Sequence, residues 1–267
     1  MKYSNIILLS DLDGTLLNTD TELSQNNIDA INFFMSEGGR FGIATGRGIS
    51  NVAKILPDLP VNFQSIFFNG SILYDKQADK VIKARYLDKD NVLPVVQNCL
   101  LKYPDIAIQV CTAKDGYFVS DKNRTNKMGL EDHIPYNFTD IEVVTKQDWT
   151  KVLFISNLKQ LELVETSAAK LKEDKIVDDV YSGEIYYELL PCGSNKGAMA
   201  KHIKKGQDDV IYAVGNYYND VEMIEFADVG IFSQNTPEDL KTRGLHKHIC
   251  KDCDNDAIAD VIYNIIG

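Results

Sequence analysis

The stretch DLDGTLL, Asp11 to Leu17, directly follows the short apolar run NIILLS near the start of the 267-residue chain. Such a run, ended by acids and a glycine, is typical of a buried strand. Asp11 and Asp13 stand two residues apart, so a regular continuation of the strand would aim both carboxylates to the same side. Two close carboxylates repel and raise one pKa, unless they share a cation or a proton. The pair also fits a structural cap and turn, but Gly14 and Thr15 after it make the stretch more specific.

Strands and helices alternate on the C-terminal side of this stretch. SQNNIDAINFFMSEG (residues 24–38) has apolar residues at helical spacing, with Ser24 placed to be the N-cap. RFGIATGRG (residues 40–48) predicts a second strand, and QSIFFNGS (residues 64–71) predicts a third. Strands that alternate with helices imply right-handed crossovers and a parallel sheet covered on both faces.

The pattern changes after about residue 83. A helical segment is followed by runs such as DIAIQVCT, GYFVS and IEVVT (residues 141–145), which predict strands grouped in hairpins. Grouped strands favour an antiparallel sheet with helices on one face. The alternating pattern then returns. The sequence thus predicts an α/β core of residues 1–82 and 188–267, interrupted by an inserted α+β domain of residues 83–187.

The composition limits the partners and the location of the protein. Its 39 acidic and 28 basic side chains give a net charge of −11, which argues against nucleic acid or an anionic membrane as the main partner. The apolar run at the N-terminus is too short for a secretory signal, and no run approaches the roughly 18 apolar residues of a membrane span. Five cysteines without a signal fit reduced thiols. We therefore expect a cytoplasmic protein.

One cysteine and histidine cluster needs separate treatment. HKHICKDC places His246, His248 and Cys250 at a period of two, with Cys253 three residues further on. On a strand the first three would share a face, as metal ligands do. The segment also fits a short strand that runs into a polar turn. We favour the strand, because no second pair follows at zinc-finger spacing.

The motif D-x-D-G-T-L resembles motif one of the haloacid dehalogenase superfamily of phosphohydrolases. The other three motifs of that family have counterparts in the same order: Thr45 and Gly46 end the second strand, Lys196 opens a helix, and GNYYND (residues 215–220) follows a later strand. The insertion is similar to the type IIB cap of the Cof-type sugar-phosphate phosphatases. The resemblance covers essentially the whole chain and implies a Rossmann-like core with an inserted cap.

The resemblance also implies a mechanism. Asp11 would be the nucleophile that forms an aspartyl phosphate, and Asp13 would be the general acid and base. The phosphate would be held by Thr45, Gly46, Lys196 and Asn219. An Mg²⁺ ion would be held by Asp11, the Asp13 backbone carbonyl, Asn216 and Asp220.

Asn216 departs from the family pattern, in which the first residue after the glycine of motif four is an acid. An amide oxygen can ligate Mg²⁺ but adds no charge, so we expect a lower metal affinity. We expect an active phosphatase for small phosphorylated metabolites, present as a monomer or weak homodimer. Two alternatives stay open: a phosphometabolite-binding regulatory protein, and a phosphotransferase similar to phosphomannomutase.

In this family the cap selects the substrate. Polar and aromatic side chains of the insertion are candidates for that task, although most of them are expected on the solvated surface: Tyr117, Lys122, Arg124, Asn126, Lys127 and Tyr187.

Overall fold

The computed structural model describes residues 1–113, 115–126, 137–203 and 205–267, and the chain forms two compact units. The first unit comprises Met1–Gly46, Leu56–Lys83 and Asn195–Gly267. The second comprises Arg47–Ile55 and Ala84–Ser194. No helix among the described residues is long and apolar enough to cross a membrane.

A parallel sheet forms the centre of the first unit. Its strand order is β13-β12-β11-β1-β2, and every neighbouring pair is parallel. The strands span β1 (Ile6–Ser10), β2 (Arg40–Ile43), β11 (Val210–Gly215), β12 (Val229–Ser233) and β13 (His248–Cys250). Apolar side chains on both faces of β1 and β11 explain why the sequence shows continuous apolar runs there.

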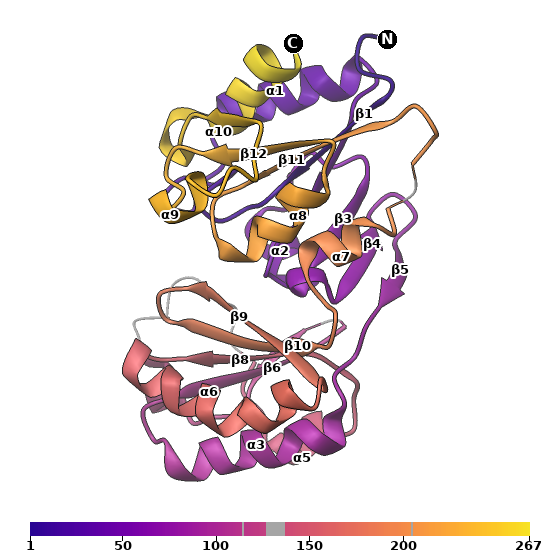
Figure 1. The fold of residues 1–267 in the computed structure, drawn as a ribbon. Helices are drawn as coiled ribbons and strands as arrows, with labels where there is room; N and C mark the ends of the chain where they lie inside the picture. The colour runs from indigo at the N-terminus through magenta and orange to yellow at the C-terminus, as the bar shows by residue number, and fades with distance from the viewer. Residues whose placement is uncertain (114, 127–136, 204) are drawn as a thin grey trace. The chain divides into compact units, whose positions relative to one another are not determined.

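Helices cover both faces of this sheet, as Figure 1 shows. One face carries α1 and α10, and the other carries α7 and α8. The helices of the unit are α1 (Gln25–Ser36), α7 (Lys196–Ala200), α8 (Val221–Phe226), α9 (Glu238–Lys241) and α10 (Ala257–Asp260), which continues as a wider helical turn over Val261–Ile266. The predicted α/β architecture is confirmed.

Helix α1 begins where the sequence predicts it. The Ser24 side chain accepts a hydrogen bond from the Asn27 N–H at 3.1 Å. Asn27 is itself buried: its Nδ2 donates to the Leu16 carbonyl at 3.3 Å, and its Oδ1 accepts from the Ala259 N–H at 2.9 Å. One amide therefore joins the chain after the D-x-D stretch to the last helix.

A small antiparallel sheet extends the first unit. It has the order β3-β4-β5, with β3 (Gln64–Phe67), β4 (Ile72–Asp75) and β5 (Lys80–Ala84). Strand β3 lies beside the end of β2 through a parallel bridge between Ala44 and Ile66. The predicted third strand is thus present, next to the parallel sheet.

The second unit is an antiparallel sheet with helices on one face (Figure 1). Its strand order is β7-β6-β8-β10-β9. The strands are β6 (Ala107–Thr112), β7 (Gly116–Phe118), β8 (Trp149–Ile155), β9 (Val177–Gly183) and β10 (Tyr186–Pro191). The helices are α2 (Ile49–Ile55), α3 (Lys89–Lys102), α4 (Lys122–Asn126), α5 (Ile141–Val144) and α6 (Leu158–Glu173).

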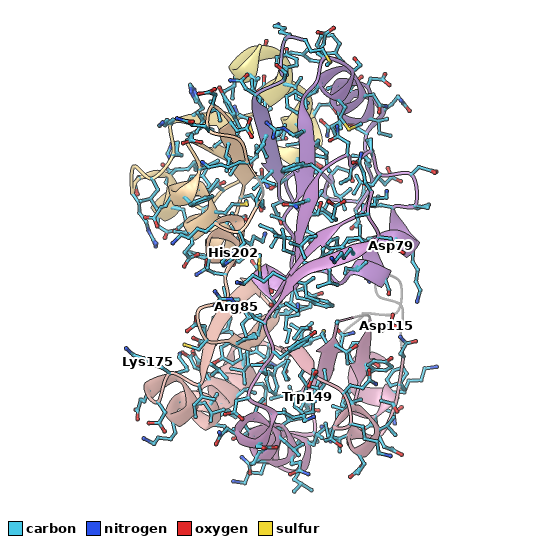
Figure 2. All side chains as sticks on the ribbon, turned by 90° about the vertical axis from the view of Figure 1, so that its right-hand side faces the viewer. Asp79, Arg85, Asp115, Trp149, Lys175 and His202 are labelled. Carbon is cyan, nitrogen blue, oxygen red and sulfur yellow. The ribbon has the colours of Figure 1, made fainter. Side chains whose placement is uncertain are left out.

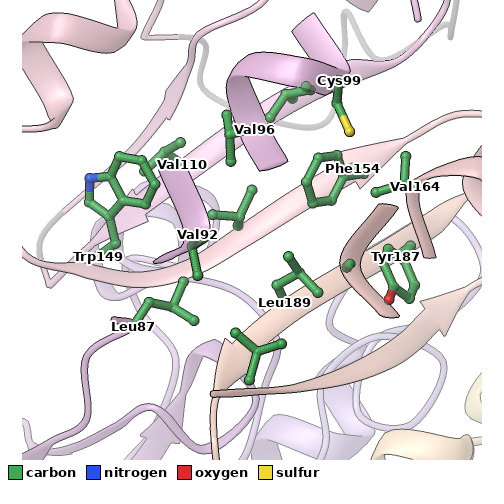
Figure 3. Packing of buried hydrophobic residues seen from close by; sticks show 14 of the residues in the cluster. Leu87, Val92, Val96, Cys99, Val110, Trp149, Phe154, Val164, Tyr187 and Leu189 are labelled. Atoms are coloured by element: carbon green, nitrogen blue, oxygen red, sulfur yellow. The ribbon is translucent and has the colours of Figure 1, made fainter. Parts of the chain in front are cut away.

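The core of the second unit lies between this sheet and helices α3 and α6. Figure 3 shows its packing: Val92 and Val96 of α3 and Val164 of α6 meet Phe154 of β8 and Leu189 of β10. Trp149 is fully buried at one end of this core, and its Nε1 donates to the Val144 carbonyl at 2.9 Å.

Three sequence expectations need correction in this unit. IEVVT was predicted as a strand but forms α5, because the Val144 side chain packs into the core and the Val144 carbonyl accepts from Trp149. The predicted return to the core at residue 188 falls inside β10, which stays paired with β9 as far as Pro191. Residues 47–55 group with the second unit.

The two chain segments at the edge of the second unit are tied together. Arg85, labelled in Figure 2, donates to the Gly193 carbonyl at 2.9 Å and to the Cys192 carbonyl at 3.4 Å. The Gly193 N–H donates to Asp178 at 2.7 Å. Because Gly193 has a φ of 75°, a residue with a side chain would be strained there.

Candidate active site

Three strands of the first unit end, and one helix begins, at the same edge of the parallel sheet. Asp11 follows β1, Thr45 follows β2, Asn216 follows β11, and Lys196 begins α7. The carboxyl edge of a parallel sheet is where open α/β folds bind their ligands. The sheet order, with β1 between β2 and β11, brings the motif-bearing strands side by side.

A buried lysine joins two carboxylates at this edge. Lys196 Nζ donates to Asp11 Oδ1 and to Asp220 Oδ1, each at 2.6 Å. The Lys196 side chain is fully buried, and those of Asp11 and Asp220 are 8% and 0% exposed. Charge-assisted contacts of this length, held in a dry environment, are strong and well oriented.

This environment shifts two pKa values. Burial raises the pKa of the Asp11 carboxyl to about 7; the Lys196 ammonium opposes this shift, while Asp220 and Asp13 add to it by repulsion. Burial lowers the pKa of Lys196, but Asp11 and Asp220 reverse this effect and raise it above its ordinary value. The site therefore favours the charged form of Lys196 and raises the pKa of Asp11 well above that of an ordinary carboxyl.

Asp220 supports the loop that it ends. Its Oδ2 accepts from the Asn216 N–H at 2.9 Å and from the Tyr217 N–H at 3.1 Å, while its Oδ1 accepts from Lys196. A Cβ at Gly215 would lie 2.4 Å from the Asp220 Cγ, so only glycine fits at that position. These contacts make Asp220 the residue that orients both Lys196 and the start of the GNYYND loop.

Asn216 lies against the D-x-D-G-T loop. Its Oδ1 accepts from the Thr15 hydroxyl at 3.3 Å, and a Cβ added at Gly14 would fall 2.5 Å from its Nδ2. Gly14 also has a φ of 73°, which favours glycine. Motifs one and four therefore meet through the amide of Asn216.

Asp13 differs from Asp11 in its surroundings. Its side chain is exposed, whereas Asp11 is buried. Its charge nevertheless acts on Asp11, because it helps to raise the Asp11 pKa. An exposed carboxyl next to a buried one suits proton exchange with a ligand or with water.

The remaining phosphate-binding candidates lie along the end of β2 and the GNYYND loop. Thr45 is fully buried, and its N–H donates to the Ile66 carbonyl at 2.9 Å. Asn219 Nδ2 donates to Asn69 Oδ1 at 3.0 Å, and Gly46 lies against the Asn69 amide. Asn69 was not among the sequence-based candidates. The signal for it was the Asn-Gly pair directly after a strand, which marks a tight turn.

Other sequence candidates have structural tasks or stay untested. Tyr187 points into the core of the second unit and donates to Asp179 at 2.9 Å, so it does not line a cleft. Arg124 donates to the Leu100 carbonyl at 2.9 Å and fixes the end of α3. Lys127 lies outside the described residues. Tyr117 packs against the core, and Lys122 is exposed.

The cysteine and histidine segment forms the predicted strand β13 and turn. His248 and Cys250 belong to β13, and Cys253 begins a short turn of helix. Within the described part of the chain, no three or more His, Cys, Asp or Glu side chains gather in a way that could hold a metal ion. The ring centroids of His246 and Phe232 lie 5.3 Å apart.

The fold and the site together define an α/β protein with a buried, lysine-paired carboxyl at the edge of a parallel sheet. A family model for haloacid dehalogenase-like hydrolases matches residues 8–262. The chain belongs to this family of hydrolases, and the family predicted from the sequence is confirmed.

Known proteins of the same kind cover the chain almost from end to end. A Bacillus subtilis protein named "Putative phosphatase YxeH" is 26% identical over 264 residues, which cover 91% of this chain and 94% of that protein. A haloacid dehalogenase-like hydrolase from Bacteroides thetaiotaomicron superposes with a TM-score of 0.83 at 22% identity, over 99% of this chain and 100% of the other.

A subclass IIB sugar phosphatase of the same superfamily shares the fold with a TM-score of 0.78 at 16% identity, over 97% of this chain and 98% of that one. The predicted fold is confirmed by these structures. The prediction of a hydrolytic enzyme of the phosphatase type agrees with the family and with the names of its relatives.

Proposed function

We propose that this enzyme is an Mg²⁺-dependent phosphatase that hydrolyses small phosphate monoesters, sugar phosphates first and nucleotide or cofactor phosphates next. The observation that carries the proposal is the buried Lys196 ammonium, 2.6 Å from a carboxylate oxygen of Asp11 and of Asp220. The shared fold with a sugar phosphatase supports the choice of substrate class.

The reaction would consist of two displacements at phosphorus. In the first, an oxygen of Asp11 forms a bond to phosphorus while the bond to the leaving oxygen breaks, and Asp13 gives that oxygen a proton. In the second, Asp13 takes a proton from water, whose oxygen attacks phosphorus and releases Asp11. The exposed position of Asp13 allows it to reach both the leaving oxygen and water.

The protein stabilises the charge that develops on the phosphoryl oxygens. Lys196 holds Asp11 in one orientation and supplies a fixed positive charge. The Thr45 hydroxyl, the Gly46 N–H and the Asn219 amide are the donors for the equatorial oxygens. All of them come from loops at the carboxyl edge of the sheet.

The donors present fit a hard divalent cation. Asp11 offers a carboxylate, Asn216 an amide oxygen and Asp13 a backbone carbonyl, which together form the oxygen-only set that Mg²⁺ prefers. When bound, Mg²⁺ would reduce the repulsion between Asp11 and the phosphate. Asp220 would support the metal site without being a direct ligand, because its oxygens accept hydrogen bonds from Lys196 and from two backbone N–H groups.

The proposal is tested by the release of inorganic phosphate from a panel of sugar phosphates, nucleotides and cofactor phosphates. Mg²⁺ is titrated from micromolar to tens of millimolar. We expect turnover of at least one sugar phosphate, and a loss of about a thousandfold or more in Asp11→Asn, which keeps the shape of the side chain and removes the nucleophile. Circular dichroism of the variant controls for folding.

Two observations favour a second function. Asn216 removes a charge from the metal site, and Asp11 has a pKa near neutrality, so turnover could be slow while binding persists. The chain would then be a phosphometabolite-binding or regulatory protein. Tight binding of one panel member without turnover at high Mg²⁺ would establish this reading. Transfer of the phosphoryl group to a second sugar hydroxyl would indicate a phosphotransferase instead.

Four further properties remain predictions from the sequence. A small phosphorylated metabolite is the proposed partner, the proposed location is the cytoplasm, and the proposed state is a monomer or weak homodimer. The inserted domain is proposed to select the substrate.

A further inference from the structure

The Phe68–Gly70 turn follows β3 and has an unusual backbone. Phe68, Asn69 and Gly70 have φ angles of 51°, 50° and 100°. Glycine adopts such angles freely and asparagine tolerates them, but a phenylalanine there is strained. All three residues are buried. Strain of this kind persists only where the surrounding structure holds it in place, and it gathers at functional sites.

The turn fixes the end of β2. The Asn69 N–H donates to the Thr45 carbonyl at 3.0 Å. A Cβ at Gly46 would lie 3.1 Å from both Asn69 Oδ1 and Asn69 Nδ2, so the amide plane packs directly on the Gly46 backbone. Two proposed phosphate-binding residues are thus held by one asparagine.

The same side chain reaches the GNYYND loop. Asn219 Nδ2 donates to Asn69 Oδ1 at 3.0 Å, across 150 residues of sequence. An amide has a donor end and an acceptor end, and only the donor end suits an anion. Because Asn69 Oδ1 accepts from Asn219 Nδ2, it fixes the orientation of the Asn219 amide. No described residue accepts a hydrogen bond from the second N–H of Asn219 Nδ2, which can therefore donate to an oxygen of the ligand.

The next residue of the turn reaches the lysine segment. A Cβ at Gly70 would fall 2.1 Å from the Asn195 carbonyl oxygen, so the turn packs against the residue that caps α7. The Asn195 side chain caps this helix by accepting from the Ala198 N–H at 2.6 Å. Lys196 follows directly. The turn therefore touches the segments that carry Thr45, Asn219 and Lys196.

We propose that Asn69 is a positioning residue, which orients the Asn219 amide and the Thr45–Gly46 backbone for binding of a phosphoryl group. The proposal rests on the proposed function, because it assigns a task within the same site. Asn69 acts through its amide, and the left-handed backbone is the condition under which that amide reaches both partners.

Two substitutions remove the Asn69 amide and differ in the backbone strain that they add. Asn69→Gly removes the amide and suits the φ of 50°. Asn69→Ala removes the same amide and adds backbone strain. For both variants we expect kcat/KM to fall about tenfold and the Kd for inorganic phosphate to rise about tenfold, the size of one lost hydrogen bond to a charged group. Tm should stay within about 2 °C for Asn69→Gly and drop further for Asn69→Ala.

The pairing with Asn219 is tested by a double-mutant cycle. In an Asn219→Ala background, Asn69→Gly should lower kcat/KM clearly less than tenfold, because one of the two groups that it orients is gone and only the contact with Thr45–Gly46 remains. A full tenfold loss in that background would show that Asn69 does not act through Asn219, and it would overturn the proposal. Wild-type kcat/KM and phosphate affinity in Asn69→Gly would overturn it as well.

The remaining outcomes are also decisive. If neither single variant folds, Asn69 is a structural residue and the proposal is wrong. If one folds, it decides alone, since both lack the amide. If the wild-type protein hydrolyses no monoester, the proposed function fails, while calorimetric titration with inorganic phosphate still shows whether Asn69 supports phosphate binding.

Discussion

Each unit of the molecule buries a lysine, and the two lysines differ in how their charge is balanced. In the second unit Lys151 Nζ donates to Glu188 Oε1 at 3.0 Å, with both side chains at most 5% exposed. The Ser182 hydroxyl also donates to Glu188 Oε1, at 2.7 Å. In the first unit, Lys196 lies between two carboxylates.

The difference is the one expected between a structural ion pair and the functional one that we propose. Lys151 and Glu188 cancel each other, so the pair can stay buried without any further ion. Lys196 leaves one surplus negative charge when Asp11 and Asp220 are both ionised. The rise of the Asp11 pKa to about 7 reflects this surplus together with burial. A buried group that is not neutral by itself suits a site that takes up a cation and an anion together.

Replacing each lysine is expected to have the largest effects and tests this comparison most directly. Lys151→Met leaves Glu188 buried without its cation, and should lower the free energy of unfolding by about 3–5 kcal/mol. Adding Glu188→Leu should recover most of this loss. Urea unfolding measures both changes.

Lys196→Met should act on turnover as well as on stability: it leaves Asp11 and Asp220 buried without their cation, and kcat of the folded protein should fall about a hundredfold or more, since Asp11 loses the group that orients it. The Lys151→Met protein, assayed where it is folded, should keep its kcat. Equal losses of kcat in both variants would refute the division into a structural and a functional lysine.

The Asp11 pKa predicts the acid limb of the pH profile. Only the ionised carboxyl attacks, so kcat/KM at low Mg²⁺ should fall about tenfold per pH unit below about 7. Raising Mg²⁺ should move the limb to lower pH, because a cation favours the carboxylate. If the pH of this acid limb does not change with the Mg²⁺ concentration, a group other than Asp11 is titrating.

The same shift gives the sign of a stability effect. The folded protein holds a proton on Asp11 between about pH 4 and pH 7, where the unfolded chain has released it. The contribution of Asp11 to stability is therefore greatest at low pH and is lost as the pH rises through about 7. Urea unfolding of wild type and Asp11→Asn at both ends of this window measures it.

The smallest expected effect comes from adding a negative charge at residue 216. Asn216→Asp adds a carboxylate beside Gly14 and should lower the Mg²⁺ concentration for half-maximal activity about tenfold, the effect of about 1.4 kcal/mol. Mg²⁺ affinity measured by calorimetry without substrate should change in parallel. An unchanged requirement would place residue 216 away from the metal.

The sequence predicted the elements whose patterns are local. The apolar run before Asp11 and the capped helix after Ser24 follow from burial and capping alone, and both are present. Asp11 and Thr45 follow neighbouring parallel strands, which end at one edge of the sheet, and Lys196 reaches Asp11 from the start of α7.

What the sequence could not predict depends on partners that are distant in the chain. IEVVT has the composition of a strand, but it forms helix α5, whose Val144 carbonyl accepts a hydrogen bond from Trp149. Tyr187 looked like a cleft residue, although alternation along β10 turns it into the core. Asn69 was missed because its partner, Asn219, lies 150 residues away.

The Asn27 side chain links the N-terminal and C-terminal parts of the chain by hydrogen bonds. Its buried amide spans from the Leu16 carbonyl to the Ala259 N–H, so the final helix completes the support of the loop that carries Asp11 and Asp13. A chain shortened to end before Ala259 would lose this donor together with the fully buried side chains of Val261 and Ile262. The C-terminal helix is therefore part of the packing that supports the loop with Asp11 and Asp13.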